Sequence, residues 1–164
     1  KKQDEELMEE LMREQGFQFD FLLQIWVFLV FLSGISAVLS AFIAQYVLAI
    51  INACVFFGAF LCFFAGAYRY YVLVVALLIY TAAGLILEVY YAVALMTDFY
   101  KCDSDSCRGY KLILYDINYI CVVILSVVLF VLAKQSWIIL EDHKRIVQAT
   151  VEIELEKYHK EKEN

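Results

Sequence analysis

Forty-eight consecutive residues, from Phe21 to Tyr68, carry no charge: FLLQIWVFLVFLSGISAVLSAFIAQYVLAIINACVFFGAFLCFFAGAY. The hydrocarbon core of a bilayer takes roughly 20 apolar residues per helix, so this stretch is too long for one span and fits two spans joined by a tight turn. A second apolar stretch, 70–97, contains one charged residue, Glu88, and a third runs from about 112 to 137. The sequence therefore predicts an all-α fold, an integral membrane bundle of four transmembrane helices.

The expected organisation is one membrane domain with two short helical tails. The spans cover about 21–43, 47–67, 70–97 and 112–137, within a membrane domain at 17–137. Residues 1–16 read as an amphipathic helix, because apolar residues recur at one-turn spacing opposite an acidic face, and Gly16 offers a break before the first span. Residues 138–164 keep a helical apolar face and are expected as a second tail helix. The chain begins at Lys1 rather than Met, so its natural start is expected upstream.

The basic residues indicate which side of the membrane the tails occupy. With four spans both tails share a side, and that side together with Arg69 carries ten of the thirteen Lys and Arg residues, against Lys101, Arg108 and Lys111 opposite. The positive-inside rule then places both tails in the cytosol. The expected location is a eukaryotic endomembrane or the plasma membrane, with the mitochondrial inner membrane as the alternative. The acidic amino-terminal tail argues against nucleic acid as a partner.

Small residues recur along the spans at three- and four-residue spacing. Such rows let helix backbones approach closely, which is one source of helix association in lipid. The row in the second span has a four-residue period and is expected to pack against the first span of the same chain rather than to form a homodimer. The expected helix-packing residues are Ser33, Ala37, Ala41, Cys54, Gly58, Cys62, Gly66 and Gly84.

Glu88 is the one formally charged residue well inside an expected span. A carboxylate at that depth is costly unless it is protonated, paired or hydrated, so an intramembrane acid is a functional hypothesis. Asp116 and Asn118 are further intramembrane polar residues, near the start of the last span. Two interpretations of Glu88 stay open. One is structural, with hydrogen bonds to interfacial water or to a neighbour such as Asn118, and the other is a role in handling ions or protons.

The loop between the third and fourth spans contains Cys102-Asp-Ser-Asp-Ser-Cys107. In an extracytosolic loop these two cysteines are expected to form a disulfide. A calcium loop would need a Gly and a distal acid that are absent, and a redox site would need Cys-x-x-Cys spacing. Cys54, Cys62 and Cys121 are expected as small apolar packing residues. No metal site and no cofactor are expected, since neither histidine has a neighbour at metal-ligand spacing.

The layout resembles that of small four-span eukaryotic membrane proteins of the MARVEL-like and lysosome-associated types. The shared features, between Phe21 and Trp137, are cytosolic tails, a minimal first outer turn, Arg69 in a short inner loop, and a larger second outer loop with a cysteine pair. Members of these groups act in vesicle traffic, at junctions and as partners of larger membrane proteins, so the resemblance implies protein interaction. The tetraspanin Cys-Cys-Gly signature and the claudin-like Trp and Cys pattern are absent, and no functional residue is carried over.

The chemistry of the sequence favours a binding protein over an enzyme. A nucleophile elbow, a phosphate-binding loop and a dinucleotide fingerprint are all missing. We expect a non-enzymatic scaffold or accessory subunit that contacts membrane lipid and packs against another integral membrane protein or a second copy of itself. One alternative is an oligomeric ion or proton channel that uses Glu88. Another is an accessory subunit of a mitochondrial membrane complex.

Overall fold

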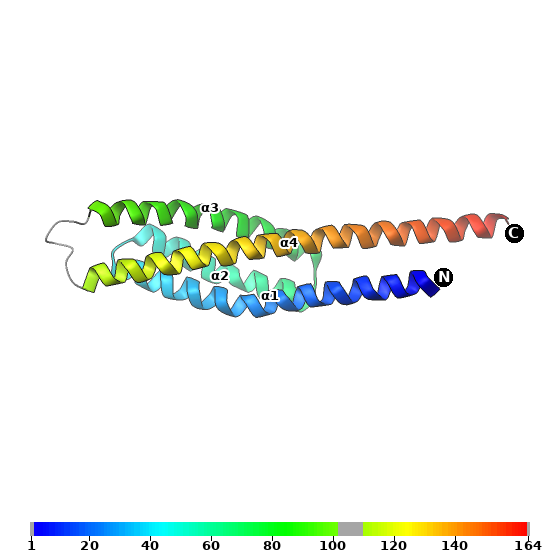
Figure 1. The fold of residues 1–164 in the computed structure, drawn as a ribbon, viewed down its shortest axis with the longest axis horizontal. Coiled ribbons are helices and arrows are strands. Elements are labelled where there is room, and N and C mark those ends of the chain that lie inside the picture. The colour runs from blue at the N-terminus through cyan, green and yellow to red at the C-terminus, as the bar shows by residue number, and fades with distance from the viewer. Residues whose placement is uncertain (1, 102–109, 164) are drawn as a thin grey trace.

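The computed structural model describes residues 2–101 and 110–163, and within them every regular element is an α-helix. The helices are α1 (Lys2–Phe42), α2 (Tyr46–Tyr68), α3 (Tyr71–Lys101) and α4 (Tyr110–Glu163) (Figure 1). Each contains a segment long and apolar enough to cross a membrane. The prediction of an all-α chain with four such helices is confirmed. Helices suit an apolar solvent because they satisfy every backbone polar group internally.

Two of the helices are much longer than a bilayer requires. At 1.5 Å per residue, the 41 residues of α1 and the 54 of α4 extend about 60 and 80 Å, against about 30 Å of hydrocarbon. Their outer ends project from the same end of the bundle and run beside each other (Figure 1). The break expected at Gly16 does not occur, since α1 is continuous through it. One glycine in a helix interior costs only about 1 kcal/mol relative to alanine, which the flanking residues offset.

Two tight connections set the antiparallel order of the first three helices. Residues 43–45 join α1 to α2, with Ala44 in the left-handed region (φ 62°) and the Gln45 N–H donating to the Ser40 carbonyl at 2.8 Å. Tyr46, expected in the turn, already belongs to α2. Arg69 ends α2 with φ 54° and donates its N–H to the Ala65 carbonyl at 3.1 Å. This is a left-handed helix cap, which usually takes glycine.

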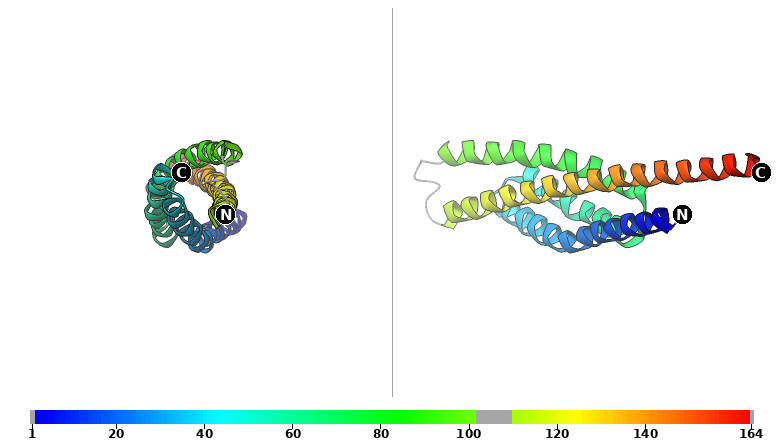
Figure 2. Two further views of the ribbon diagram at one scale, coloured as in Figure 1. Left: turned by 90° about the vertical axis from the view of Figure 1, so that its left-hand side faces the viewer. Right: turned by 45° about the vertical axis from the view of Figure 1, so that its right-hand side comes forward.

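The four helices surround two apolar cores along one axis (Figure 2). Helix α1 packs along α2 and α4, and α3 packs along α4 and, less closely, α2. The larger core, called the tail-side core, contains Phe19, Leu22, Leu29, Val55, Ala59, Cys62, Ala65, Val74, Leu77, Leu125, Leu129, Leu132 and Ile139. The smaller, called the loop-side core, contains Ile43, Leu48, Leu95 and Val122.

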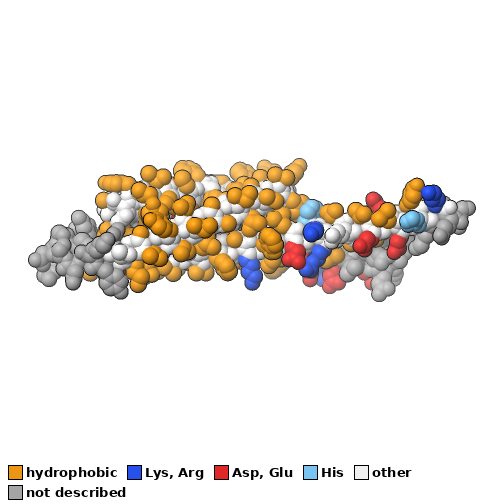
Figure 3. All heavy atoms as spheres, turned by 90° about the horizontal axis from the view of Figure 1, so that it is seen from above, with side chains coloured by type: hydrophobic (Ala, Val, Ile, Leu, Met, Phe, Trp, Pro, Cys, Tyr) orange, Lys and Arg blue, Asp and Glu red, His pale blue; other side chains and the backbone are white. Residues whose placement is uncertain are grey.

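The outer surface of the bundle is apolar on the face that Figure 3 shows, whereas Lys, Arg, Asp and Glu side chains gather over the projecting tails. Large exposed hydrophobic side chains occur on all four helices, among them Phe31, Phe57, Ile79 and Phe130. Water would not tolerate so large an apolar surface, but lipid does. The apolar surface of the bundle is compatible with an integral membrane protein.

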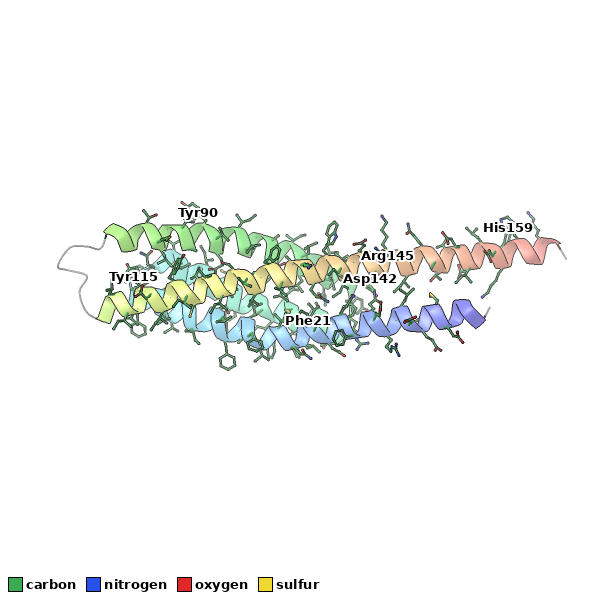
Figure 4. The ribbon with its side chains drawn as sticks, in the orientation of Figure 1. Phe21, Tyr90, Tyr115, Asp142, Arg145 and His159 are labelled. Carbon is green, nitrogen blue, oxygen red and sulfur yellow. The ribbon has the colours of Figure 1, made fainter. Side chains whose placement is uncertain are left out.

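Polar and aromatic contacts hold the tails where they leave the bundle. The Gln18 Nε2 donates to the Asp142 carboxylate at 2.9 Å, which ties α1 to α4. The rings of Tyr71 and His143 stack with centroids 3.4 Å apart. Arg69 and Asp20 form an ion pair at 3.5 Å between exposed side chains, which is worth about 0–1 kcal/mol. These contacts, together with the labelled positions of Asp142 and Arg145 in Figure 4, mark the base of the tails.

The small residues of α2 serve two neighbours rather than one. The ring of Tyr80 on α3 lies over Gly58, where an added Cβ would come within 2.2 Å of it, and its hydroxyl donates to the Val55 carbonyl at 2.5 Å. One turn on, the Cys62 thiol donates to the Leu22 carbonyl of α1 at 3.3 Å. On a helix of 3.6 residues per turn, residues four positions apart are displaced by about 40° around the helix axis. The row of small residues therefore winds around α2, from the side that contacts α3 to the side that contacts α1.

We expect Gly58→Ala to destabilise the bundle by about 1–3 kcal/mol, because the added methyl group displaces the Tyr80 ring. Gly34→Ala is the matched control, since its Cβ would meet Phe56 at an ordinary 3.4 Å and the change gains helix propensity. Thermal unfolding of both variants in detergent gives the comparison. Equal stability of the two variants would show that Tyr80 does not pack against α2 as described.

Candidate functional site

Five fully buried polar side chains lie close to the boundary between the two apolar cores, and we call them the polar layer. All four helices contribute. The members are Ser36 and Ser40 on α1, Asn52 on α2, Glu88 on α3 and Asn118 on α4. On α1, α2 and α3 they fall between residues of the tail-side core and residues of the loop-side core, and Asn118 lies one turn before Val122 of the loop-side core.

Three hydrogen bonds between side chains link three of the helices through this layer. The Ser36 hydroxyl donates to the Asn118 Oδ1 at 2.9 Å, and the Asn118 Nδ2 donates to the Ser40 Oγ at 2.9 Å. The Asn52 Nδ2 donates to the Ser36 Oγ at 3.0 Å. Asn118 thus bonds to two serines one helical turn apart, which fixes the height of α4 against α1. Each interhelical hydrogen bond of this kind contributes at most about 1–2 kcal/mol to the free energy of helix association in lipid.

Glu88 brings an acid into this layer with no partner for it. Its side chain is 0% exposed, and among the described residues neither Oε1 nor Oε2 accepts or donates a hydrogen bond. The Asn52 Oδ1 is likewise buried and without a partner. The hydrogen bond from Glu88 to Asn118 considered from the sequence is not formed, because Asn118 is engaged by Ser36 and Ser40.

The register of α3 against its neighbours places Glu88 at the height of Asn52. A Cβ on Gly84 would lie 4.0 Å from the Val55 Cγ2 of α2 and 3.4 Å from the Leu129 Cδ1 of α4. One turn toward the loop end, α3 reaches Glu88 and α2 reaches Asn52, since the two helices are antiparallel. The three unpartnered oxygen atoms therefore face the interior of the bundle at one level.

The other residues singled out in the sequence fall into different surroundings. Asp116 is exposed on α4, whereas Asn118 is fully buried. Ser33, Cys62, Gly66 and Gly84 are buried between helices, and Ala37 and Gly58 are half-buried. Ala41 and Cys54 are exposed on the outer surface of the bundle. Cys102 and Cys107 lie outside the described residues, and the three cysteines within them are free.

Asn52 is the functional candidate that the sequence patterns missed. Its signal was present, since it is an isolated amide in the apolar stretch that forms α2, and an amide at membrane depth requires a partner. Ser36 and Ser40 are small residues of the kind that lets helices pack closely, and their hydroxyl groups also form hydrogen bonds with Asn118. Among the described residues, no three His, Cys, Asp or Glu side chains come together in a way that could hold a metal ion.

A second candidate site lies on the tail of α4, outside the apolar spans. Val147, Val151, Leu155 and Tyr158 recur at three- and four-residue spacing with exposed fractions of 46, 49, 53 and 59%. We call them the tail stripe. The opposite face of the same helix, at Ile146, Ala149 and Ile153, is half-buried on the side of α1. The tail stripe is thus an apolar face that α1 leaves uncovered.

No protein-family model, no curated protein and no solved structure matches this chain.

We expect Asn118→Leu, which keeps the size of the side chain, to destabilise the bundle by about 1–2 kcal/mol, because Ser36 and Ser40 lose their partner. Asp116→Asn is the control, since Asp116 is exposed two residues away. The free energy of unfolding in detergent measures both. An Asn118→Leu protein as stable as the control would contradict the hydrogen-bonded layer.

Proposed function

We propose that this protein is a non-enzymatic four-span membrane protein that acts as an accessory subunit or scaffold, and that the tail stripe is its docking surface for a helix of another integral membrane protein. One observation carries the proposal. Helix α4 continues for more than 20 residues past the bundle and exposes an apolar stripe there, on the face opposite α1. An exposed apolar helix face outside lipid is the usual sign of a helical partner.

The length of the tail separates this docking surface from the membrane. The 22 residues from Asp142 to Glu163 extend about 33 Å, and α4 runs on in line with its span rather than folding back (Figure 1). His159 lies far out on this extension in Figure 4. The tail stripe is therefore presented to the aqueous side, where a protein helix and not lipid is available to cover it.

The charges beside the tail stripe favour a different protein over a second copy. Glu152 and Glu154 are exposed and flank Val151 and Leu155 on the two sides of the helix. Two copies packed stripe to stripe would bring these acids together at the centre of the contact, and like charges flanking a helical seam oppose pairing. A partner helix with an apolar stripe flanked by Lys or Arg is the complement.

The interior of the bundle supports this function better than conduction. Glu88 faces the inside of a single chain, between two apolar cores, rather than the outer surface where neighbouring chains would meet. Lipid-facing side chains occupy that outer surface. For orientation we retain cytosolic tails, which the distribution of Lys and Arg supports, in a eukaryotic endomembrane or the plasma membrane.

We expect Val151→Glu to release the partner while leaving the bundle intact, because a carboxylate at the centre of the tail stripe cannot be covered by an apolar helix. Protein purified from its native membrane in mild detergent should give a particle heavier than one chain, by native mass spectrometry, with a second membrane protein in fixed ratio. The Val151→Glu particle should have the mass of a single chain.

Thr150→Glu is the matched control. It adds the same charge one residue away, on an exposed side of α4 about a quarter turn from the tail stripe. It should keep the heavier particle. A wild-type particle with the mass of a single chain would contradict the proposal, and so would loss of the partner in both variants alike. A heavier particle that contains only copies of this chain would show that the tail stripe binds a second copy and not another protein.

A further inference from the structure

The polar layer has an imbalance that no side chain among the described residues corrects. Its unpartnered atoms are Asn52 Oδ1, Glu88 Oε1 and Glu88 Oε2, which are all hydrogen-bond acceptors when the carboxyl group is ionised. The layer also holds one negative charge in that state, at a site shielded from water. What is missing is therefore positive charge and at least one hydrogen-bond donor.

Among the described residues, no charged or titratable neighbour of Glu88 supplies the missing positive charge, and none donates a hydrogen bond to Glu88. Between Phe21 and Phe42, α1 contains no titratable residue. Helix α2 offers the thiols of Cys54 and Cys62, the first exposed and the second bonded to the Leu22 carbonyl. On α4 the candidates are Tyr119 and Cys121, and on α3 they are Tyr80, whose hydroxyl is bonded to Val55, and Tyr91. Thiols and phenols of this kind carry no positive charge.

Among the side chains that the structure describes, the cations lie far from Glu88 along the bundle. Lys134 is exposed on α4, nine residues beyond the buried Leu125 that lies at the height of Glu88, or about 13 Å along the axis. Arg69 is at the tail end, paired with Asp20. The tail-side core separates both from the polar layer. A metal ion is a poor substitute, because hard cations take about six oxygen ligands and the layer leaves three oxygen atoms free.

We infer that the polar layer is a proton-binding site: Glu88 is held in the folded bundle as a neutral carboxylic acid whose O–H is shared with the Asn52 Oδ1. An O–H bond forms on one Glu88 oxygen as an O–H bond of a solvent hydronium ion breaks, and the hydronium ion leaves as water. The added hydrogen supplies the donor that the Asn52 Oδ1 lacks, and the added charge cancels that of the carboxylate. A single proton thereby cancels the charge and occupies two of the three oxygen atoms, while the second Glu88 oxygen stays without a hydrogen bond.

This site stores a proton and does not pass it on. Apolar side chains lie on both sides of Glu88 and Asn52, with Val55 and Leu129 toward the tails and Leu48 and Leu95 toward the loop. Release of the proton would leave an unpaired charge in the interior, so loss of the proton is coupled to loosening of the helix packing. The inference is independent of the tail stripe and of any partner.

Infrared spectroscopy of the full chain in lipid or detergent at neutral pH tests the inference directly. Exposed Asp and Glu are ionised at neutral pH, so a C=O stretch of a protonated carboxylic acid reports a buried acid. Wild type should show this band and Glu88→Gln should lack it, while Asp116→Asn, which removes an exposed acid, should keep it. Asn52→Leu should shift the band to the frequency of a more weakly bonded acid, which a merely structural role of Asn52 would not do.

Absence of the band in wild type, or its survival in Glu88→Gln, would overturn the inference whether or not the variants fold well. A second arm identifies a bound metal ion instead. Replacing Na⁺ or K⁺ by N-methylglucamine at constant ionic strength should leave the melting temperature of wild type unchanged. A melting temperature that depends on the alkali ion, together with no acid band, would assign the site to that ion and reject the proton.

Discussion

The hydrogen bonds that Asn118 makes to Ser36 and Ser40 are the constraint on which the packing of this bundle depends. In lipid, apolar side chains gain little by meeting one another, because acyl chains are equally apolar. Leu, Val and Phe on the four spans can therefore pack in many registers at similar cost. Polar side chains cannot pack in many registers, because each polar atom left without a hydrogen-bond partner in hydrocarbon raises the free energy of the fold. The polar layer selects one height for α4 against α1, and Asn52 extends the same selection to α2.

Small residues let this layer form by bringing the backbones close together. Gly58 accepts the ring of Tyr80, and Gly66 lies against the Phe19 carbonyl and Leu23, where a Cβ would come within 3.1 Å of the backbone oxygen. Cys62 adds a weak thiol hydrogen bond to Leu22. These contacts join α2 to α1 and α3 without much specificity of their own. The hydrogen bonds of the polar layer thus fix the register between helices, and the contacts at small residues fix the distance between helix backbones.

The sequence predicts the class of fold well, because a run of uncharged residues longer than a bilayer is thick permits few structures. It also predicts the two hairpins and the projecting tail of α4, where no Pro interrupts the pattern. It does not predict which face of each helix points inward, because a lipid-facing Phe57 and a buried Val55 are both apolar. For the same reason the sequence pattern predicts one packing surface for the row from Cys54 to Gly66, although Cys54 is exposed and Gly66 is buried. Asn52 and Glu88 come to the same level only through the register between α2 and α3, which depends on tertiary contacts at Tyr80 and Gly84.

The polar layer forms inside one chain, where its side chains are fully buried. The most direct measurement is nuclear Overhauser spectroscopy of the full chain in detergent micelles, on the side-chain amide protons of Asn118 and Asn52. We expect contacts from Asn118 to Ser40 and from Asn52 to Ser36, with slow exchange of these amide protons with water. Contacts from either amide to detergent acyl chains, or exchange at the rate of a free amide, would contradict this expectation.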